Sequence, residues 1–306
     1  MSLLQLGMSL SRTQIMAAVL DAEGRQSRIE RLATPTGYAA LLDALTQLAD
    51  RADPTRALPF GLAIPGSIAP RSGRVRNCNL PFLNGRDLHP DLESATGRPV
   101  RLANDADCLA LSEARDGAGA RGRVVFGVIL GDGVGGGVLI DGLPLTGAAG
   151  SGGEWGHSPL PWPRPDEVPG PRCWCGLEGC MEQWVSIPAL EREHQRLAHF
   201  ARPIRLAEIV RQANDGAAAA RSALEDYINR LGRGLAALCN LIDPDVIVLG
   251  GEGAELGLLY DQLQGAIAPY AISDGSAAVI VKAAHGDASI ARGAAWLWPG
   301  TALARA

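Results

Sequence analysis

The amino-acid sequence predicts an α/β fold built as two lobes with a cleft between them, and three observations support this prediction. The first part of the chain reads as strand, strand, strand, helix and strand. The second part begins in a similar way, with a strand, a glycine-rich turn and a returning strand, which suggests an internal duplication of the fold. A chain of 306 residues is also long enough for two domains that each bury a core.

The first lobe is expected to begin with two strands, at residues 3–10 and 14–20, followed by a third strand near residues 27–32. Residues 38–52 are predicted to form a helix, because their leucines recur at helical spacing. Residues 59–64 are typical of a buried strand. This order of elements is the opening order of the actin-like, ribonuclease H-like ATPase fold.

Two polar residues stand where the next strand of the first lobe is expected to end. The segment 67–84 is rich in Gly, Pro, Asn and Arg and is predicted to be loop. A strand at residues 99–103 then delivers Asn104 and Asp105 at its carboxyl end. Asp105 fits the N-cap of the helix that follows. Such junctions are also where open α/β sheets bind ligands, so both interpretations stay open.

The second lobe is expected to begin with a buried strand at residues 124–130, a glycine-rich turn at 131–137 and a returning strand at 138–140. The other elements predicted from apolar spacing are helices at residues 88–96, 106–115, 216–241, 256–267 and 290–298, and strands at 245–249 and 279–282. The longest of these helices is predicted to be interrupted around Gly232 and Gly234, because glycine is a poor helix former.

We expect a cytoplasmic protein with its first lobe at residues 1–117 and 290–306 and its second lobe, which carries a cysteine-rich loop, at residues 118–289. The net charge is −5 and the arginines are scattered, which argues against a nucleic-acid-binding surface. The N-terminus lacks a basic segment followed by a long apolar run, so neither a signal peptide nor a membrane span is expected.

Four potential metal ligands lie close together in the second lobe: His157, Cys173, Cys175 and Cys180. One imidazole and three thiolates are the ligand set of a closed, tetrahedral structural zinc site. Two glycines inside the cysteine segment let it fold back on itself. The alternative is that the cysteines are free core thiols or a disulfide pair. Three cysteines within eight residues, in a chain without a secretory signal, favour zinc.

The segment that holds these ligands resembles a family signature. The run G-x-x-G-E-W-G-H, followed by C-x-C-G-x-x-G-C-x-E, is similar to the signature of the ROK family (repressors, open reading frames and sugar kinases). Further runs, such as A-I-P-G-S-I-A-P and H-G-D-A-S-I-A-R-G-A-A-W-L-W-P, extend the resemblance over nearly the whole chain and are most similar to bacterial fructokinase and manno(fructo)kinase members.

The resemblance implies an ATP- and Mg²⁺-dependent kinase that phosphorylates the 6-hydroxyl of fructose or a related hexose and that forms a homodimer. N-acetylglucosamine kinases share many of these motifs, so they are an alternative substrate class. Asp105 matches the general base, which takes the proton of the attacking hydroxyl. The matching sugar-side positions are Ser67, Asn79, Asn104, Asp105, Glu154, His157 and Glu182. Zinc would order this loop and would not perform the reaction.

Two glycine-rich turns resemble the nucleotide side of the family's site. Gly131, Asp132 and Gly133 match the second phosphate loop, in which the family usually has a threonine in place of Asp132. Gly250 and Gly251 match the adenosine loop. Exposed backbone N–H groups in such turns can bind phosphate, although hairpins require glycine for their own reasons.

The first phosphate loop departs from the family pattern. The family has D-x-G-G-T-K between the first two strands, whereas this chain has S-L-S-R-T-Q at residues 9–14. The carboxylate that serves Mg²⁺ and both glycines are replaced, and Thr13 is kept. Arg12 either binds phosphate directly or blocks the site. The replacements predict weaker stabilisation of the transition state, because charge neutralisation dominates phosphoryl-transfer catalysis.

Two other functions are alternatives to a kinase. The replaced first loop favours a sugar-binding protein with weak or no kinase activity. A transcriptional repressor is disfavoured, because repressors of the family carry a helix-turn-helix module before the kinase-like body. Here the first predicted strand begins almost at residue 1, and the net charge is negative.

Overall fold

The computed structural model describes residues 4–273 and 278–298 and divides the chain into two compact units. Their ranges are Met1–Arg121, Gly137–Gly153 and Ala283–Ala306 for unit 1, and Gly122–Gly136 and Glu154–Lys282 for unit 2. Residues 1–3 and 299–306, which the sequence assigned to the first lobe, lie outside the described residues.

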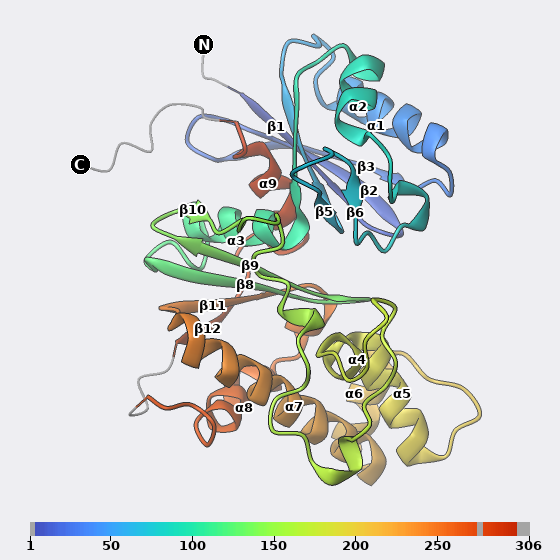
Figure 1. Ribbon diagram of the computed structural model, residues 1–306, viewed down its shortest axis with the longest axis vertical. Helices are drawn as coiled ribbons and strands as arrows, with labels where there is room; N and C mark the ends of the chain where they lie inside the picture. The colour runs from blue at the N-terminus through green and yellow to red at the C-terminus, as the bar shows by residue number, and fades with distance from the viewer. Residues whose placement is uncertain (1–3, 274–277, 299–306) are drawn as a thin grey trace. The chain divides into compact units, whose positions relative to one another are not determined.

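Unit 1 is built on a five-stranded sheet with the strand order β3-β2-β1-β4-β7 (Figure 1). Its strands are β1 (Gln5–Leu10), β2 (Gln14–Leu20), β3 (Gln26–Ala33), β4 (Phe60–Ile64) and β7 (Val100–Asn104). β1, β2 and β3 pair antiparallel, whereas β1, β4 and β7 pair parallel. The predicted opening of strand, strand, strand, helix and strand is confirmed.

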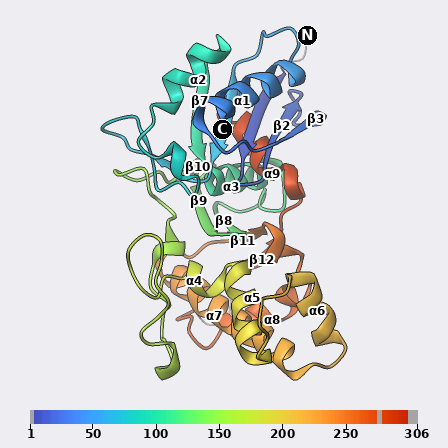
Figure 2. The same cartoon turned by 90° about the vertical axis from the view of Figure 1, so that its right-hand side faces the viewer.

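Helices cover both faces of this sheet (Figure 2). On one face, α1 (Tyr38–Ala52) and α2 (Leu88–Thr96) bury their leucines against β1, β2 and β4. On the other face lie α3 (Asp105–Asp116) and α9 (Ser289–Ala295). α9 lies so close to β1 that a Cβ atom on Gly7 would be 2.1 Å from the carbonyl oxygen of Ala291. Glycine in the strand therefore permits direct packing of backbone on backbone.

Short elements complete the description of unit 1. They are β5 (Ser67–Ile68), β6 (Val75–Arg76), β10 (Leu143–Pro144) and the 3₁₀ turns η1 (Pro81–Leu83) and η5 (Gly286–Ala288). β5 and β6 pair antiparallel inside the segment predicted to be loop.

The second sheet has the order β10-β9-β8-β11-β12, and its other strands are β8 (Val124–Leu130), β9 (Val134–Ile140), β11 (Val246–Gly250) and β12 (Val279–Lys282). β11 pairs parallel with both β8 and β12, and β10 pairs antiparallel with β9. The middle strand of the first sheet is β1, which lies between β2 and the parallel strand β4. The middle strand of the second sheet is β8, which lies in the same way between β9 and the parallel strand β11. The two sheets share one topology, as the internal duplication of an actin-like ATPase fold requires.

The helices of unit 2 are α4 (Glu182–Val185), α5 (Ile187–Ala198), α6 (Leu206–Asn214), α7 (Ala218–Ile242) and α8 (Leu258–Ile267). Its 3₁₀ turns are η2 (Trp155–His157), η3 (Pro165–Glu167) and η4 (Glu252–Glu255). α4, α5 and α6 were not predicted from the sequence. α7 is the long helix of this unit, and it contacts α4, α5, α6 and α8.

The prediction of an interrupted α7 was wrong, because the helix runs through both glycines. A Cβ atom on Gly232 would lie 2.5 Å from the Cβ of Ala266, and one on Gly234 would lie 2.3 Å from Cε of Met181. The glycines thus serve close packing of neighbouring side chains against the helix and do not break it.

Two other predicted boundaries were also wrong. The turn after β8 ends at Gly133, and the glycines at 135–137 belong to β9. Gly137 is needed there because a Cβ atom would lie 2.3 Å from the carbonyl oxygen of Ala106. α9 ends at Ala295. After it, the N–H groups of Leu297 and Trp298 donate to the carbonyls three residues earlier, those of Ala294 and Ala295, which is the pattern of a 3₁₀ turn.

Within the described residues, none of the helices is both long enough and apolar enough to cross a lipid bilayer.

Candidate active site and metal-binding cluster

In unit 1 the predicted base and the first phosphate turn lie at the same edge of the sheet. β1, β4 and β7 are parallel, so their carboxyl ends, at Leu10, Ile64 and Asn104, point in one direction. Ile64 is the register partner of Asn104. Open α/β sheets bind ligands beyond the carboxyl ends of their strands, which makes this edge a candidate site.

Asn104 is the N-cap of α3. Its Oδ1 accepts hydrogen bonds from the backbone N–H groups of Ala106 (2.8 Å) and Asp107 (3.3 Å), and its Nδ2 donates to the carbonyl of Gly66 (3.1 Å). Asp105 follows in the first turn, half-buried, and its Oδ1 accepts from the N–H of Ala106 at 2.9 Å. Because Asn104 supplies the helix cap, capping does not explain why an aspartate stands at position 105.

Two further sugar-side candidates lie just beyond β4. Ser67 is buried, with 4% of its surface exposed, and its hydroxyl has no hydrogen-bond partner among the described residues. Buried hydroxyls are normally bonded, so this one is available to a ligand. Asn79 has an exposed side chain, and its backbone N–H donates to the carbonyl of Pro65 at 3.3 Å. Both residues therefore adjoin the end of the same strand.

The first turn, between β1 and β2, is closed by the hydroxyl of Ser11. This hydroxyl donates to the carbonyl of Gln14 (2.9 Å) and accepts from the backbone N–H groups of Thr13 (3.4 Å) and Gln14 (3.1 Å). A phosphate bound at this turn would need such N–H groups. The side chains of Arg12 and Thr13 are exposed, and residues 9–14 include no carboxylate.

In unit 2 the two glycine-rich turns adjoin each other. β8 and β11 are parallel, and Gly250 pairs with Ile129. Gly251 has a φ of +82°, and a Cβ atom there would lie 2.5 Å from the carbonyl oxygen of Leu130. The turn of residues 131–133, which carries the exposed Asp132, therefore lies beside the predicted adenosine loop.

Glu182 also lies against this turn, although it is distant in sequence. Its carboxylate is buried, and Oε2 accepts from the backbone N–H of Val134 at 3.2 Å. A Cβ atom on Gly133 would come within 2.9 Å of the same oxygen. The other oxygen, Oε1, accepts from Nε1 of Trp174 at 2.6 Å. One predicted sugar ligand is thereby brought next to the second phosphate turn.

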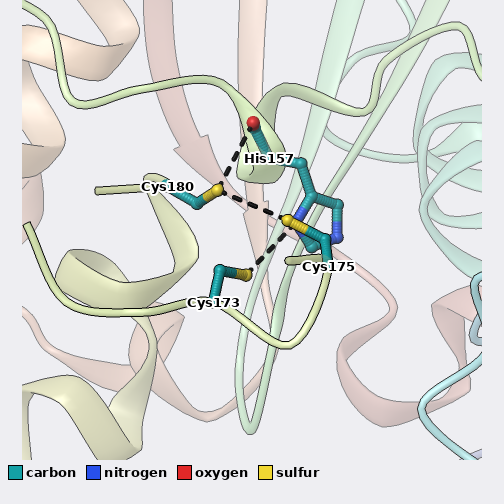
Figure 3. A group of neighbouring side chains, drawn as sticks. All are labelled: His157, Cys173, Cys175 and Cys180. Atoms are coloured by element: carbon teal, nitrogen blue, oxygen red, sulfur yellow. Dashed lines mark hydrogen bonds between the residues drawn. The ribbon is translucent and has the colours of Figure 1, made fainter. Parts of the chain in front are cut away.

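The predicted metal ligands form one cluster (Figure 3). The ligand atoms of His157, Cys173, Cys175 and Cys180 all lie within 4.8 Å of one another. Sγ of Cys173 is 3.6 Å from Nδ1 of His157, and the Sγ atoms of Cys175 and Cys180 are 3.6 Å apart, which is far longer than a disulfide bond. All four side chains point toward a common centre, as a tetrahedral ion would require.

Main-chain geometry brings the three thiols together. Cys173 donates its N–H to the carbonyl of Leu177 at 2.7 Å, and Gly176 and Gly179 have φ values of +96° and +73°. Both glycines adopt the left-handed conformation that the short loop requires. Burial raises the pKa of the Cys180 thiol to about 12, so at neutral pH this group would lose its proton only on binding a cation.

The segment before the cysteines is fixed on the sheet by Trp155. Its indole Nε1 donates to the carbonyl of Gly135 at 3.1 Å, and its ring packs edge-on against Phe126. His157 follows two residues later, and its N–H donates to the carbonyl of Glu154 at 3.2 Å. Glu154 is half-buried at the start of η2.

The predicted residues thus form two sets, one in each unit. Unit 1 holds Arg12, Thr13, Ser67, Asn79, Asn104 and Asp105, and unit 2 holds Gly131, Asp132, Gly133, Glu154, His157, Cys173, Cys175, Cys180, Glu182, Gly250 and Gly251.

Sequence reasoning missed two contributors to the second set. Trp174 contacts both His157 and Glu182, and its place between two predicted metal ligands is a signal that could have identified it. Glu167 joins the proline-rich loop to α7 through Arg233, and nothing local in the sequence indicates that pairing.

The family model described as ROK family matches residues 5–301. The N-acetyl-D-glucosamine kinase of Salmonella paratyphi B is 34% identical over 298 residues, which cover 95% of this chain and 98% of that relative. Among solved structures, a ROK hexokinase from Thermus thermophilus is 34% identical with a TM-score of 0.82, covering 96% of this chain and 97% of the other. A ROK family glucokinase from Streptomyces griseus, in complex with glucose and AMPPNP, is 27% identical with a TM-score of 0.83, covering 96% and 98%.

Proposed function

This chain belongs to the ROK family and is a sugar kinase, and we propose that it transfers the γ-phosphoryl group of ATP to a hexose hydroxyl with Asp105 as the general base. The position of Asp105 carries the proposal. Its carboxylate lies in the first turn of α3, beyond the carboxyl end of β7 at the candidate site, while Asn104 supplies the helix cap. A carboxylate there can accept the proton of the attacking hydroxyl as the bond to phosphorus forms.

Two hexoses are the leading acceptors. N-acetylglucosamine is the first, because relatives named N-acetyl-D-glucosamine kinase are 34% to 35% identical over nearly the whole chain. Fructose is the second, on the motifs G-E-W-G-H-S-P-L-P-W and A-I-P-G-S-I-A-P. With either sugar the proposed nucleophile is the 6-hydroxyl, and the proposed sugar ligands are those named from the family motifs.

Zinc is part of the proposal as a structural ion. Four residues match a structural zinc site in ligand type and in number: His157, Cys173, Cys175 and Cys180. Their ligand atoms lie close enough together to share one ion. The ion would order the segment that carries His157 and Glu182. The proton transfer belongs to Asp105.

The first turn does not fit a Mg²⁺ site, because residues 9–14 offer hydroxyls and no carboxylate. We therefore propose that Mg²⁺ arrives bound to the phosphates of ATP. The hydrogen bonds of Ser11 to two turn amides favour a second candidate function, a weakly active protein that binds a hexose and turns it over slowly.

The proposal is tested by an ADP-release assay with Mg·ATP against N-acetylglucosamine, fructose, mannose and glucose. Asp105→Asn is expected to lower sugar-dependent turnover about 100-fold or more. Asp43→Asn, which removes an exposed acid on α1, is the matched control and should keep full activity. Full activity in Asp105→Asn would exclude it as the base. Hexose binding by calorimetry without turnover would favour the second candidate.

A homodimer, which the family resemblance implies, completes the proposal. Sedimentation equilibrium would test it, and a species of one chain at assay concentrations would contradict it.

A further inference from the structure

We propose that Trp174 is a positioning residue for the hexose and also lends its indole face to the sugar. This inference rests on the proposed function of Glu182 and His157. Trp174 lies between two of the metal ligands, Cys173 and Cys175. Its ring packs edge-on against the imidazole of His157, with the ring centres 4.8 Å apart and the planes at 87°.

The indole N–H of Trp174 fixes one oxygen of Glu182. Nε1 donates to Oε1 at 2.6 Å, a short, part-buried bond to a charged acceptor. The backbone N–H of Val134 holds the other oxygen at 3.2 Å. The carboxylate is therefore oriented from both sides. Each carboxylate oxygen has two lone pairs, so both can still accept a sugar hydroxyl.

Trp174 is 52% exposed, although its indole N–H group is bonded to the carboxylate of a buried glutamate. A half-exposed aromatic side chain beside a hydrogen-bond acceptor suits a pyranose. The C–H groups of the sugar would pack on the ring while a hydroxyl bonds to the acid. Trp162, which is 49% exposed, differs in this respect, because its ring packs on Tyr270.

The metal-binding loop does not require the indole for its shape. The loop is closed by main-chain bonds, from the N–H of Cys173 to the carbonyl of Leu177 and from the N–H of Gly176 to the carbonyl of Cys173. A substitution at Trp174 can therefore change the contact to Glu182 while the four metal ligands keep their places.

The test compares Trp174→Phe, which keeps a ring and removes the donor, with Trp174→Ala, which removes both. Trp162→Phe is the matched control. Kinetics with each hexose of the panel would give KM for the hexose, KM for ATP and kcat. Trp174→Phe is expected to raise the hexose KM about tenfold or more, since it removes a hydrogen bond to a charged group. Trp174→Ala should raise it further, while KM for ATP and the zinc content stay as in the wild type.

A hexose KM in Trp174→Phe equal to that of Trp162→Phe would overturn the inference and leave the kinase function standing. Loss of zinc in proportion to the rise in KM would also overturn it, because Trp174 would then act on the metal loop. If the wild type turns over no hexose, the proposed function fails, and calorimetry with the same proteins decides the inference. Weaker hexose binding by Trp174→Phe would support it, and no hexose binding by the wild type would overturn both.

Discussion

At the scale of single residues, Glu167 shows how a buried carboxylate can organise a loop that has little regular structure. It is 2% exposed, and its oxygens accept from Nη1 and Nη2 of Arg233 at 2.8 and 2.7 Å and from Nε of Arg230 at 2.9 Å. Burial raises the pKa of Glu167, but the hydrogen bonds from Arg233, from the backbone of Arg164 and from Arg230 outweigh it and lower the pKa to about 2. The loop between His157 and the cysteines is thereby tied to α7.

We predict that Glu167→Gln lowers the free energy of unfolding at neutral pH by about 3 kcal/mol, because the buried guanidinium group of Arg233 loses its counter-charge and that of Arg230 keeps only Glu193, at 3.5 Å. The pKa of Glu167 in the folded protein lies below its ordinary value of 4.5. The ionised group therefore contributes stability above about pH 4.5, and this contribution is lost as the pH falls toward 2. Urea unfolding at several pH values should show the wild type and the variant converging on acidification.

Glu208→Gln is the control for this prediction. Hydrogen bonds from Arg211 and Gln212 also lower the pKa of Glu208 to about 2, but its side chain is 38% exposed. Solvent screens such a pair, so the change in stability should be small. An equal loss in both variants would show that burial is not the cause.

At the scale of elements, the β1–β2 turn departs from the family motif D-x-G-G-T-K. Ser11 replaces a glycine of the family pattern and bonds to the two amides of Thr13 and Gln14. These two backbone N–H groups are therefore bonded to the Ser11 hydroxyl. The family resemblance implies that the corresponding N–H groups of the family bind phosphate.

We predict that Ser11→Gly lowers the KM for ATP roughly tenfold, because two N–H groups become available to a charged phosphate. The KM for the hexose should not change. Steady-state kinetics would measure both constants. Ser72→Gly is the matched control, since the hydroxyl of Ser72 likewise accepts from a turn amide, that of Arg74 at 3.4 Å, in the β5–β6 hairpin. An unchanged KM for ATP in Ser11→Gly would mean that nucleotide phosphates do not use this turn.

At the scale of the whole molecule, both units bury apolar side chains, and unit 2 also holds a group of metal ligands. Unit 1 has a large apolar core that packs the leucines of α1 and α2 against the sheet. Unit 2 holds the metal-ligand cluster, in a segment that runs from η2 to α4 with few residues in strands or long helices. Such a segment depends on cross-links for its order.

We predict that removal of zinc lowers the temperature at which unit 2 unfolds and leaves unit 1 little affected. Cys175→Ser should reproduce the effect of a chelator, because it removes one ligand through an exposed thiol. Cys239→Ser, in α7 and outside the cluster, is the control. Differential scanning calorimetry with metal analysis would measure both properties. A wild-type zinc content in Cys175→Ser would exclude that thiol as a ligand.

Most of the element order could be predicted from the sequence, because strand alternation and helical spacing are local signals. The predicted bounds of α1, α2, β8 and β12 coincide with the structure. The predictions were wrong at glycines, in the turn after β8 and in α7, because a glycine that breaks an element and one that permits close packing look alike in sequence. α4 to α6 were missed altogether.

Some features of the candidate site could likewise be predicted from the sequence, and others could not. The sequence by itself determined the ligand types of the metal cluster, the family and the identity of the candidate base, because these depend on residue type and spacing along the chain. Only the tertiary structure decided that Asn104 caps α3, that Glu182 lies against the glycine-rich turn of residues 131–133 and that Trp174 donates a hydrogen bond to Glu182. The bond from Val134 to Glu182 joins residues 48 apart and exists only after packing brings the two segments together. The bond from Trp174 to Glu182 joins residues 8 apart and depends on how the cysteine-rich loop folds.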